Sequence, residues 1–162
     1  MDPLSKKSLF SLVSSARVGS LGTLHDGAPF VSMVITAPDP TFSVWFFHVT
    51  RLSAHTQDLL KDPHASLMLA YPDEPGKDPQ QLARLSLVGK AIELEDGSLE
   101  EDSAKEIYLA KFPQMKEIVG QLGDFSFWAF RPKSARFVAG FARAFSLDAD
   151  GLKRDIEEGS KA

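Results

Sequence analysis

Residues 48–63, HVTRLSAHTQDLLKDP, carry hydroxyl, guanidinium and imidazole side chains close together. A strand predicted over residues 43–49 runs into a polar turn at residues 50–53, and a short helix is expected to begin at residues 54–56. Free N–H groups and the positive end of a helix dipole favour an anion at such a point. The pattern is therefore suited to binding a phosphate.

A simpler interpretation of the same segment is a strand end followed by a capped helix. Ser53 is a typical N-cap residue, and such caps need no ligand. Arg51 and His55 would then be solvated surface residues. Taken alone, the segment slightly favours this interpretation, because each of these residues is common at such positions.

Two other predicted strands place polar residues among apolar ones. Arg84 and Ser86 are two residues apart, so they share one face of a strand, where a buried or interfacial arginine would need an anion. An edge strand with its polar face in water fits them equally well.

Ser32 lies within the apolar run at residues 30–36, which predicts a core strand. A serine beside a cofactor ring is the alternative.

The segment at residues 124–130, DFSFWAF, alternates aromatic side chains between two faces. Phe125 and Phe127 lie on one face, and Trp128 and Phe130 lie on the other. This pattern predicts a strand buried on both sides, and in a chain of this size it suggests a dimer interface. Packing explains these rings better than stacking on a ligand does.

Composition and motifs exclude several classes of function. The chain has 162 residues, which suits one domain, and its net charge of −4 disfavours a broad nucleic-acid-binding surface. It contains no cysteine, its four histidines show no metal-ligand spacing, and P-loop, G-x-G-x-x-G and G-x-S-x-G motifs are absent. No metal site and no nucleic-acid partner are expected. The apolar stretch in residues 1–16 is too short for a secretion signal or a membrane span, so the expected location is the cytoplasm, with no membrane partner.

The order of predicted elements favours a mainly β fold with flanking helices, in the α+β class. Strands are expected at residues 18–24, 30–37, 43–49, 65–71, 85–94, 125–130, 135–139 and 143–147. Helices are expected at residues 4–16, with Ser5 as a cap, at 98–111 and 115–122, and in the polar terminus after 148–150. Pro38-Asp39-Pro40 is expected to break any strand, and Arg131-Pro132-Lys133 to join two strands.

Together these segments resemble the pyridoxamine 5′-phosphate oxidase-like family of FMN-binding split barrels, and within it the branch that includes haem-utilisation proteins. The resemblance rests on SLGTLHDGAPFVSMV, the T-x-L-x-x-H-T turn with QDLLKDPHASLML, RLSLVGKA, YLAKFP and GDFSFWAFRPKSARFVAGFARA. It covers residues 19–147 in the family's order. It implies one FMN-binding domain over residues 1–162, built as an antiparallel split β-barrel of six to eight strands with Greek-key connections.

The resemblance also implies a homodimer that holds two FMN molecules at its interface. The residues expected to contact FMN are Ser32, Met33 and Val34 along the isoalloxazine, Thr50, Arg51, Leu52, Ser53, His55 and Thr56 around the phosphate, and Arg84 on a further strand. His55 stands where the vitamin B6 oxidases carry a lysine, Ser32 where they carry an arginine, and Arg84 where they carry a glutamine.

Two departures from the family limit the expected function. Residues 137–140, FVAG, replace the oxidases' F-W-Q-G segment, and no R-x-H substrate clamp is present, so vitamin B6 oxidation is not expected. No histidine follows His64, so the C-terminal haem ligand of the haem-degrading relatives has no counterpart. The prediction is an FMN-dependent oxidoreductase acting on a small acceptor, with no catalytic residue assigned. The alternative is a non-enzymatic carrier or sensor of flavin or a haem-like ligand.

The resemblance also suggests which residues lie above the flavin ring. Residues 138–141 would form a small apolar lining, with Arg84 and Arg143 as the nearest cations. Such a lining selects a flat or hydrophobic anion. Plain barrel core is the better explanation of Val138 and Phe141.

Overall fold

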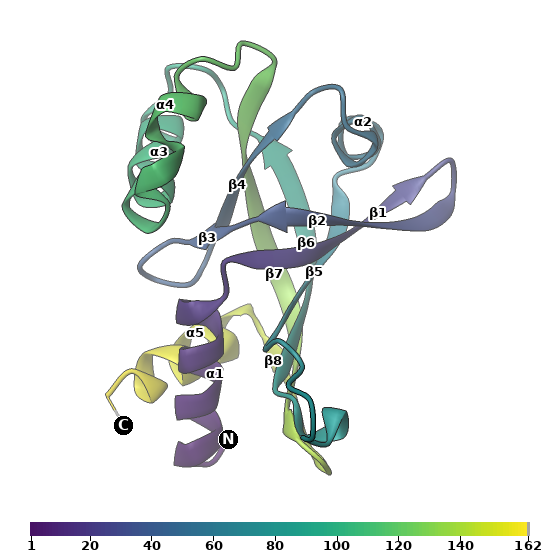
Figure 1. Cartoon of the computed structure of the whole chain (residues 1–162), viewed down its shortest axis with the longest axis vertical. Helices are drawn as coiled ribbons and strands as arrows, with labels where there is room; N and C mark the ends of the chain where they lie inside the picture. The colour runs from purple at the N-terminus through teal and green to yellow at the C-terminus, as the bar shows by residue number, and fades with distance from the viewer. Residues whose placement is uncertain (162) are drawn as a thin grey trace.

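The computed structural model describes residues 1–161, and within them all eight strands join one curled antiparallel sheet (Figure 1). The strand order is β2-β1-β5-β6-β7-β4-β3, and β8 pairs with β7. The strands are β1 (Val18–His25), β2 (Ala28–Ile35), β3 (Ala37–Pro38), β4 (Trp45–Thr50), β5 (His64–Ala70), β6 (Arg84–Glu93), β7 (Phe125–Gly140) and β8 (Arg143–Asp148). The expected split-barrel fold is confirmed.

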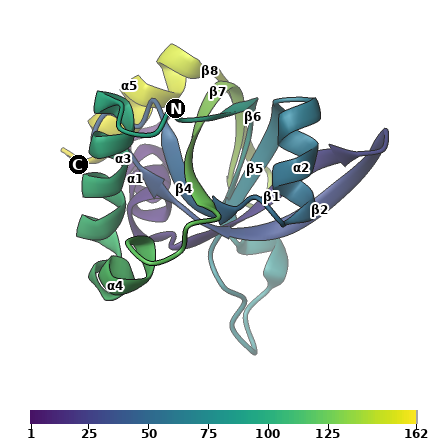
Figure 2. The same ribbon diagram turned by 90° about the horizontal axis from the view of Figure 1, so that it is seen from above.

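Helices cover the sheet at three places. In Figure 1, α1 and α5 lie together near the chain ends, α3 and α4 lie at one side, and α2 lies over the β1–β2 hairpin. Figure 2 shows α2 and the α3–α4 pair on opposite sides of the sheet. The helices are α1 (Pro3–Ser15), α2 (Ala54–Lys61), α3 (Leu99–Lys111), α4 (Lys116–Val119) and α5 (Ala149–Gly159), with short 3₁₀ turns at Pro79–Gln81 and Pro113–Met115. No helix in residues 1–161 is long and apolar enough to cross a membrane.

Strand β7 differs most from the sequence-based expectation, because it runs unbroken through Arg131-Pro132-Lys133. Its pairing with β6 shifts register between Val88 and Gly89, and Gly89 sits opposite Pro132. A Cβ at Gly89 would collide with the backbone of Arg131 and Pro132, so the glycine admits the close approach at this bulge. A bulge thus tolerates a proline that the sequence pattern alone assigns to a connection.

Three smaller expectations are also corrected. Asp2 caps α1 by accepting from the Ser5 N–H, so Ser5 lies inside the helix. Pro38 ends the two-residue edge strand β3, where the missing N–H of proline is tolerated. Helix α5 is amphipathic, because Leu152 and Ile156 are fully buried against the rest of the chain.

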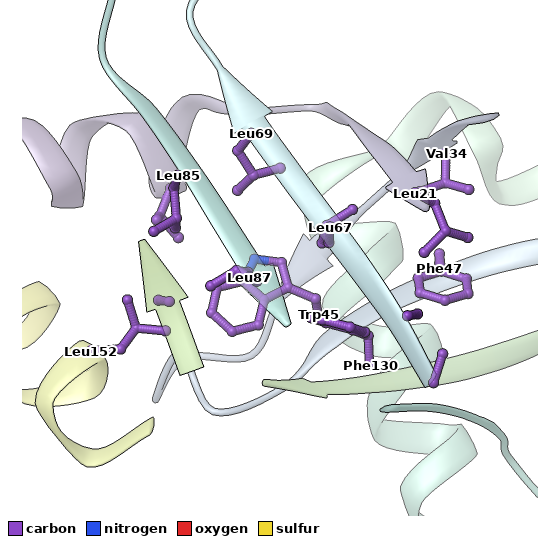
Figure 3. Packing of buried hydrophobic residues seen from close by; sticks show 14 of the residues in the cluster. Leu21, Val34, Trp45, Phe47, Leu67, Leu69, Leu85, Leu87, Phe130 and Leu152 are labelled. Atoms are coloured by element: carbon purple, nitrogen blue, oxygen red, sulfur yellow. The ribbon is translucent and has the colours of Figure 1, made fainter. Parts of the chain in front are cut away.

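Both faces of the aromatic part of β7 are covered within one chain. Trp128 and Phe130 belong to the main core, of which Figure 3 shows Phe130 near Trp45. Phe127 belongs to a second cluster that packs under α3 around Tyr108. The two-sided aromatic pattern is therefore explained by helices of the same chain. The aromatic pattern is therefore no evidence for a subunit interface, and the expected dimer would have to form over another surface.

That other surface is the outside of the sheet opposite the main core. Residues that pair across neighbouring strands share a face, so the register defines two rows over β2, β1, β5, β6 and β7. We call these rows the outer sheet face: Met33, Ser20, Met68, Ser86 and Arg136 in one row, and Val31, Gly22, Ser66, Val88 and Ser134 in the other. Met33 and Val31 expose 67% and 66% of their area, and Val88 exposes 56%. Exposed apolar side chains grouped in this way are typical of an interaction surface.

Candidate functional site

The start of α2 lies against β2, and this contact brings together four polar side chains singled out from the sequence. Ser53 is the N-cap residue of α2, with His55 and Thr56 in its first turn. Ser32 faces them because it pairs with the buried Leu21 of β1. Ser32 Oγ lies 3.0 Å from His55 Nδ1, and Ser53 Oγ lies 2.9 Å from His55 Nε2 and 2.8 Å from Thr56 Oγ1. We call Ser32, Ser53, His55 and Thr56 the hydroxyl–imidazole cluster.

The hydrogen bonds of this cluster determine which nitrogen of His55 carries the proton. Ser53 donates its only hydroxyl proton to the Thr50 carbonyl oxygen at 2.9 Å, so it can only accept from His55. His55 Nε2 is then the donor, and Nδ1 accepts from the Ser32 hydroxyl. Burial lowers the pKa of His55, against the opposing charge of Asp58. The cluster is therefore neutral at pH 7.

The other residues of the polar turn are engaged elsewhere. Thr50 donates its hydroxyl proton to Asp124 Oδ2 at 2.6 Å. Arg51 Nη2 forms an ion pair of 2.7 Å with Glu93 Oε1. Leu52 exposes 83% of its area to solvent. The turn thus presents no unpaired side-chain cation to the cluster.

The remaining three predicted contact residues lie apart from the cluster. Val34 is buried in the main core, and Met33 lies on the outer sheet face. Arg84 and Glu93 occupy opposite ends of the ten-residue strand β6, which puts Arg84 roughly 30 Å from the Arg51–Glu93 ion pair. Within one chain, Arg84 cannot share a small ligand with α2.

This geometry fits a flavin phosphate only in part. Ser53 makes no side-chain cap on α2, so the first-turn N–H groups are left to an anion. The phosphate dianion would nevertheless meet a neutral imidazole and an arginine already paired with Glu93. Backbone donors fit FMN, whereas the side-chain charges do not.

A second polar contact joins the next turn of α2 to β1, and the sequence analysis did not identify it. Asp58 is 1% exposed and uses both carboxylate oxygens. Oδ2 accepts from Thr23 Oγ1 at 2.8 Å, and Oδ1 lies 2.8 Å from His25 Nδ1. Although burial acts to raise the pKa of Asp58, the hydrogen bonds from His25 and Thr23 lower it below its ordinary value. Asp58 is thus a buried, ionised carboxylate between the helix and the hairpin.

Acid should remove the stability that Asp58 provides. A carboxyl group whose pKa is lowered by folding stabilises the native state above its unfolded pKa, near 4, and loses this effect as the pH falls through the native value. We expect Asp58→Asn to lower the free energy of unfolding by about 2 kcal/mol at pH 7, and by less at pH 3. Urea unfolding at both pH values measures the difference, with the exposed Asp73→Asn as control. An equal loss at both pH values would contradict the ionised assignment.

A cavity lies on the other side of the sheet. It has a volume of about 470 Å³ and opens between α3, α4 and the ends of β4 and β7, with His48, Lys105, Phe125 and Phe127 among its lining residues. Burial, together with the charge of Lys105, lowers the pKa of His48 to about 4. Arg51 is the one predicted contact residue that reaches this cavity. The hydroxyl–imidazole cluster lies outside it.

The residues expected above a flavin ring do not gather in one place. Ala139 lines a hollow of about 400 Å³ beside the loop at residues 71–83, whereas Phe141 exposes 64% of its area. Arg143 is bound to Asp2 at the start of α1. In the described part of the chain, these residues therefore do not line one common pocket. Among residues 1–161, no group of three or more His, Cys, Asp and Glu side chains could hold a metal ion by itself.

Comparison with known proteins supplies relatives along most of the chain. The chain is 34% identical over 152 residues to the chloroplastic non-canonical haem oxygenase HOZ of Arabidopsis thaliana, and the match covers 91% of this chain. It spans 44% of the length of that relative. A heme binding protein from Mycobacterium smegmatis is 26% identical, with a TM-score of 0.82 over 95% of this chain and 62% of the other.

A third comparison supports the fold alone. A protein from Clostridium acetobutylicum, related to general stress protein 26 and assigned to the pyridoxinephosphate oxidase family, is 16% identical with a TM-score of 0.70. The match covers 94% of this chain and 99% of the other. The family described as CREG, beta-barrel matches residues 7–151. The family model covers most of the chain, so the chain belongs to the CREG beta-barrel family, and its curled antiparallel sheet has the fold of the structures compared above.

Proposed function

We propose that this protein binds haem or a haem-like tetrapyrrole along the surface where α2 meets the β1–β2 hairpin. A relative at 34% identity is named a haem oxygenase, and one at 26% is described as a heme binding protein. The whole activity of the longer relative is part of the proposal, because this chain spans less than half of its length.

One observation carries the choice of haem over a phosphate ligand. The hydroxyl–imidazole cluster is neutral and internally hydrogen-bonded, and Arg51 is occupied by Glu93. A phosphate dianion needs cations, whereas the macrocycle of a tetrapyrrole is held mainly by apolar contact and its iron by a ligand such as an imidazole nitrogen. Phe30, exposed over 37% of its area, lies beside the ring of His25 on the same side of the hairpin. An aromatic ring between two imidazoles suits a flat, largely apolar ligand.

The proposal includes a homodimer formed over the outer sheet face. Met33, Val31 and Val88 are apolar residues of this face, and each exposes more than half of its area in the described part of the chain. A second copy would bury them and would also cover the flanks of the hairpin. The same arrangement is the one route by which Arg84 could approach a ligand held at α2 of another chain.

FMN is the second candidate, and one observation favours it. The N-cap Ser53 leaves the first turn of α2 without a side-chain cap, so backbone N–H groups can receive a phosphate. Arg51 would have to leave Glu93 to add its charge. Arg51→Ala should then weaken FMN far more than riboflavin, because only FMN carries the phosphate.

Titration of the purified protein with hemin, and separately with FMN, tests the choice. We expect a saturable Soret band at about one haem per chain and little quenching of flavin fluorescence. Phe30→Ala should weaken hemin binding, whereas Leu99→Ala, at the exposed start of α3, should leave it unchanged. Saturable FMN quenching with no hemin saturation would overturn the haem proposal in favour of the flavin.

The same preparation separates an oxygenase from a carrier. Under air and ascorbate, loss of the Soret band with release of iron would indicate oxidation of the bound tetrapyrrole. A Soret band that persists would indicate a carrier or sensor. The protein's part in either case is to bind and orient the ligand, because the haem supplies the redox chemistry.

A further inference from the structure

We propose that Nε2 of His25 is the iron ligand and that Asp58 holds the imidazole in position, an inference that rests on the proposed haem function. His25 ends β1 at the tip of the β1–β2 hairpin, which extends away from the sheet in Figure 1. Its side chain is 48% exposed, so the ring can reach a ligand from outside.

The first argument concerns which nitrogen of His25 carries the proton. A carboxylate can only accept, so the 2.8 Å contact with Asp58 Oδ1 requires a proton on His25 Nδ1. In the neutral ring, Nε2 then carries the lone pair. An imidazole whose second nitrogen donates to a carboxylate is a recurrent way to orient a metal ligand and to raise its basicity.

The second argument is the cost of burying the carboxylate. Asp58 is almost fully enclosed between α2 and β1, where an ionised group is unfavourable unless its oxygens are hydrogen-bonded. Thr23 satisfies one oxygen from within the sheet, while the other is directed to a half-exposed ring. The Thr23 and His25 contacts therefore satisfy one oxygen each of the buried carboxylate. The contact with His25 adds a fixed orientation to a side chain that would otherwise rotate freely in solvent.

The other histidines are less suited to this role. Both nitrogens of His55 are used by Ser32 and Ser53. His48 packs against Phe127 on the opposite side of the sheet. His64 also places a carboxylate on Nδ1, but that carboxylate belongs to the partly exposed Asp62 two residues away. His64 therefore makes the same kind of hydrogen bond as His25, but its carboxylate partner is not buried.

The surroundings of His25 agree with a flat ligand on this side of the hairpin. The Phe30 ring lies 5.6 Å from the imidazole, between it and Ser32 along β2. Asp26 Oδ2 lies 3.8 Å from Nε2, and Lys61 lies 3.4 Å from the other oxygen of Asp26. At 3.8 Å the Asp26 carboxylate is too far from Nε2 to hydrogen-bond with it, which leaves the nitrogen available to donate an electron pair.

The test compares His25→Gln with its match His64→Gln, using the whole chain and hemin. Glutamine can still donate to Asp58, so the fold is kept, which circular dichroism checks. We expect His25→Gln to lose the iron–histidine stretch in the resonance Raman spectrum of the ferrous protein and to shift the Soret band. His64→Gln should keep the iron–histidine stretch and leave the Soret band at its wild-type position. Asp58→Asn should keep the stretch at a lower frequency and weaken hemin binding about tenfold, because the imidazole becomes a poorer donor.

The outcomes separate this inference from the function on which it rests. Wild-type protein that binds hemin and shows an iron–histidine stretch unchanged in His25→Gln would overturn the ligand assignment and leave the haem function standing. Loss of the stretch in His64→Gln instead would do the same. Wild-type protein that does not saturate with hemin would overturn both.

Discussion

Trp128→Ala should lower the free energy of unfolding by about 4 kcal/mol, the largest loss of stability that we expect from a single substitution in this chain. Trp128 is 1% exposed and lies in the main core on the strand that joins both sides of the molecule. Its indole also donates to Ser126 Oγ at 3.0 Å. The substitution would remove this hydrogen bond and leave a large cavity between β7 and its neighbours.

Denaturant unfolding measures this loss, and Phe141→Ala is its control. Phe141 is an aromatic residue in the turn after β7, but it is 64% exposed, so truncation should change the free energy of unfolding by less than about 0.5 kcal/mol. The loss at Trp128 should not depend on protein concentration, because this side chain is buried within one chain. A loss that appears only in a dimer would restore the interface interpretation of the aromatic strand.

How far the fold can be predicted is seen best in β7. Alternating aromatics indicated a strand buried on both sides, and this is correct. What covers each side is not encoded locally, because Phe127 packs on Tyr108 of α3 and Trp128 packs in the sheet core. Pro132 predicted a break in the strand, because proline has no N–H group to donate to a neighbouring strand. The bulge that accommodates it depends on Gly89, which lies 43 positions earlier in the chain.

The candidate site shows the same division between local and long-range information. The turn and the start of α2 were predicted from residue types and spacing, and Ser53, His55 and Thr56 do come together there. Their chemistry was not predictable, because it depends on partners distant in sequence. Glu93 neutralises Arg51, and the cluster is closed by a residue of β2.

Asp58 shows what pattern reasoning missed. In the sequence it follows Gln57 in a polar part of a short helix, where an aspartate is ordinarily solvated. In the structure, Asp58 faces β1, where its carboxylate is hydrogen-bonded to Thr23 and His25. These partners are distant in sequence, so the burial of Asp58 could not be predicted from its own helix.

Met33→Lys should convert a dimer into monomers. Met33 lies in the outer sheet face, next to Ser20 of β1 and two positions from Val31. In a two-fold dimer each substitution appears twice, so two lysines would be buried against apolar surface. At about 2 kcal/mol each, the dissociation constant should rise roughly a thousandfold. Sedimentation over a range of micromolar concentrations measures the shift.

The control for the dimer prediction is Leu99→Lys, which places the same charge on an exposed leucine at the start of α3. It should leave the dissociation constant unchanged, because α3 lies away from the outer sheet face in Figure 2. Wild-type protein that is monomeric at these concentrations, or a Met33→Lys protein that stays dimeric, would contradict the interface. If the wild type is monomeric, Arg84 stays roughly 30 Å from the Arg51–Glu93 ion pair at the other end of its own β6 strand, and its expected ligand contact is lost with the dimer.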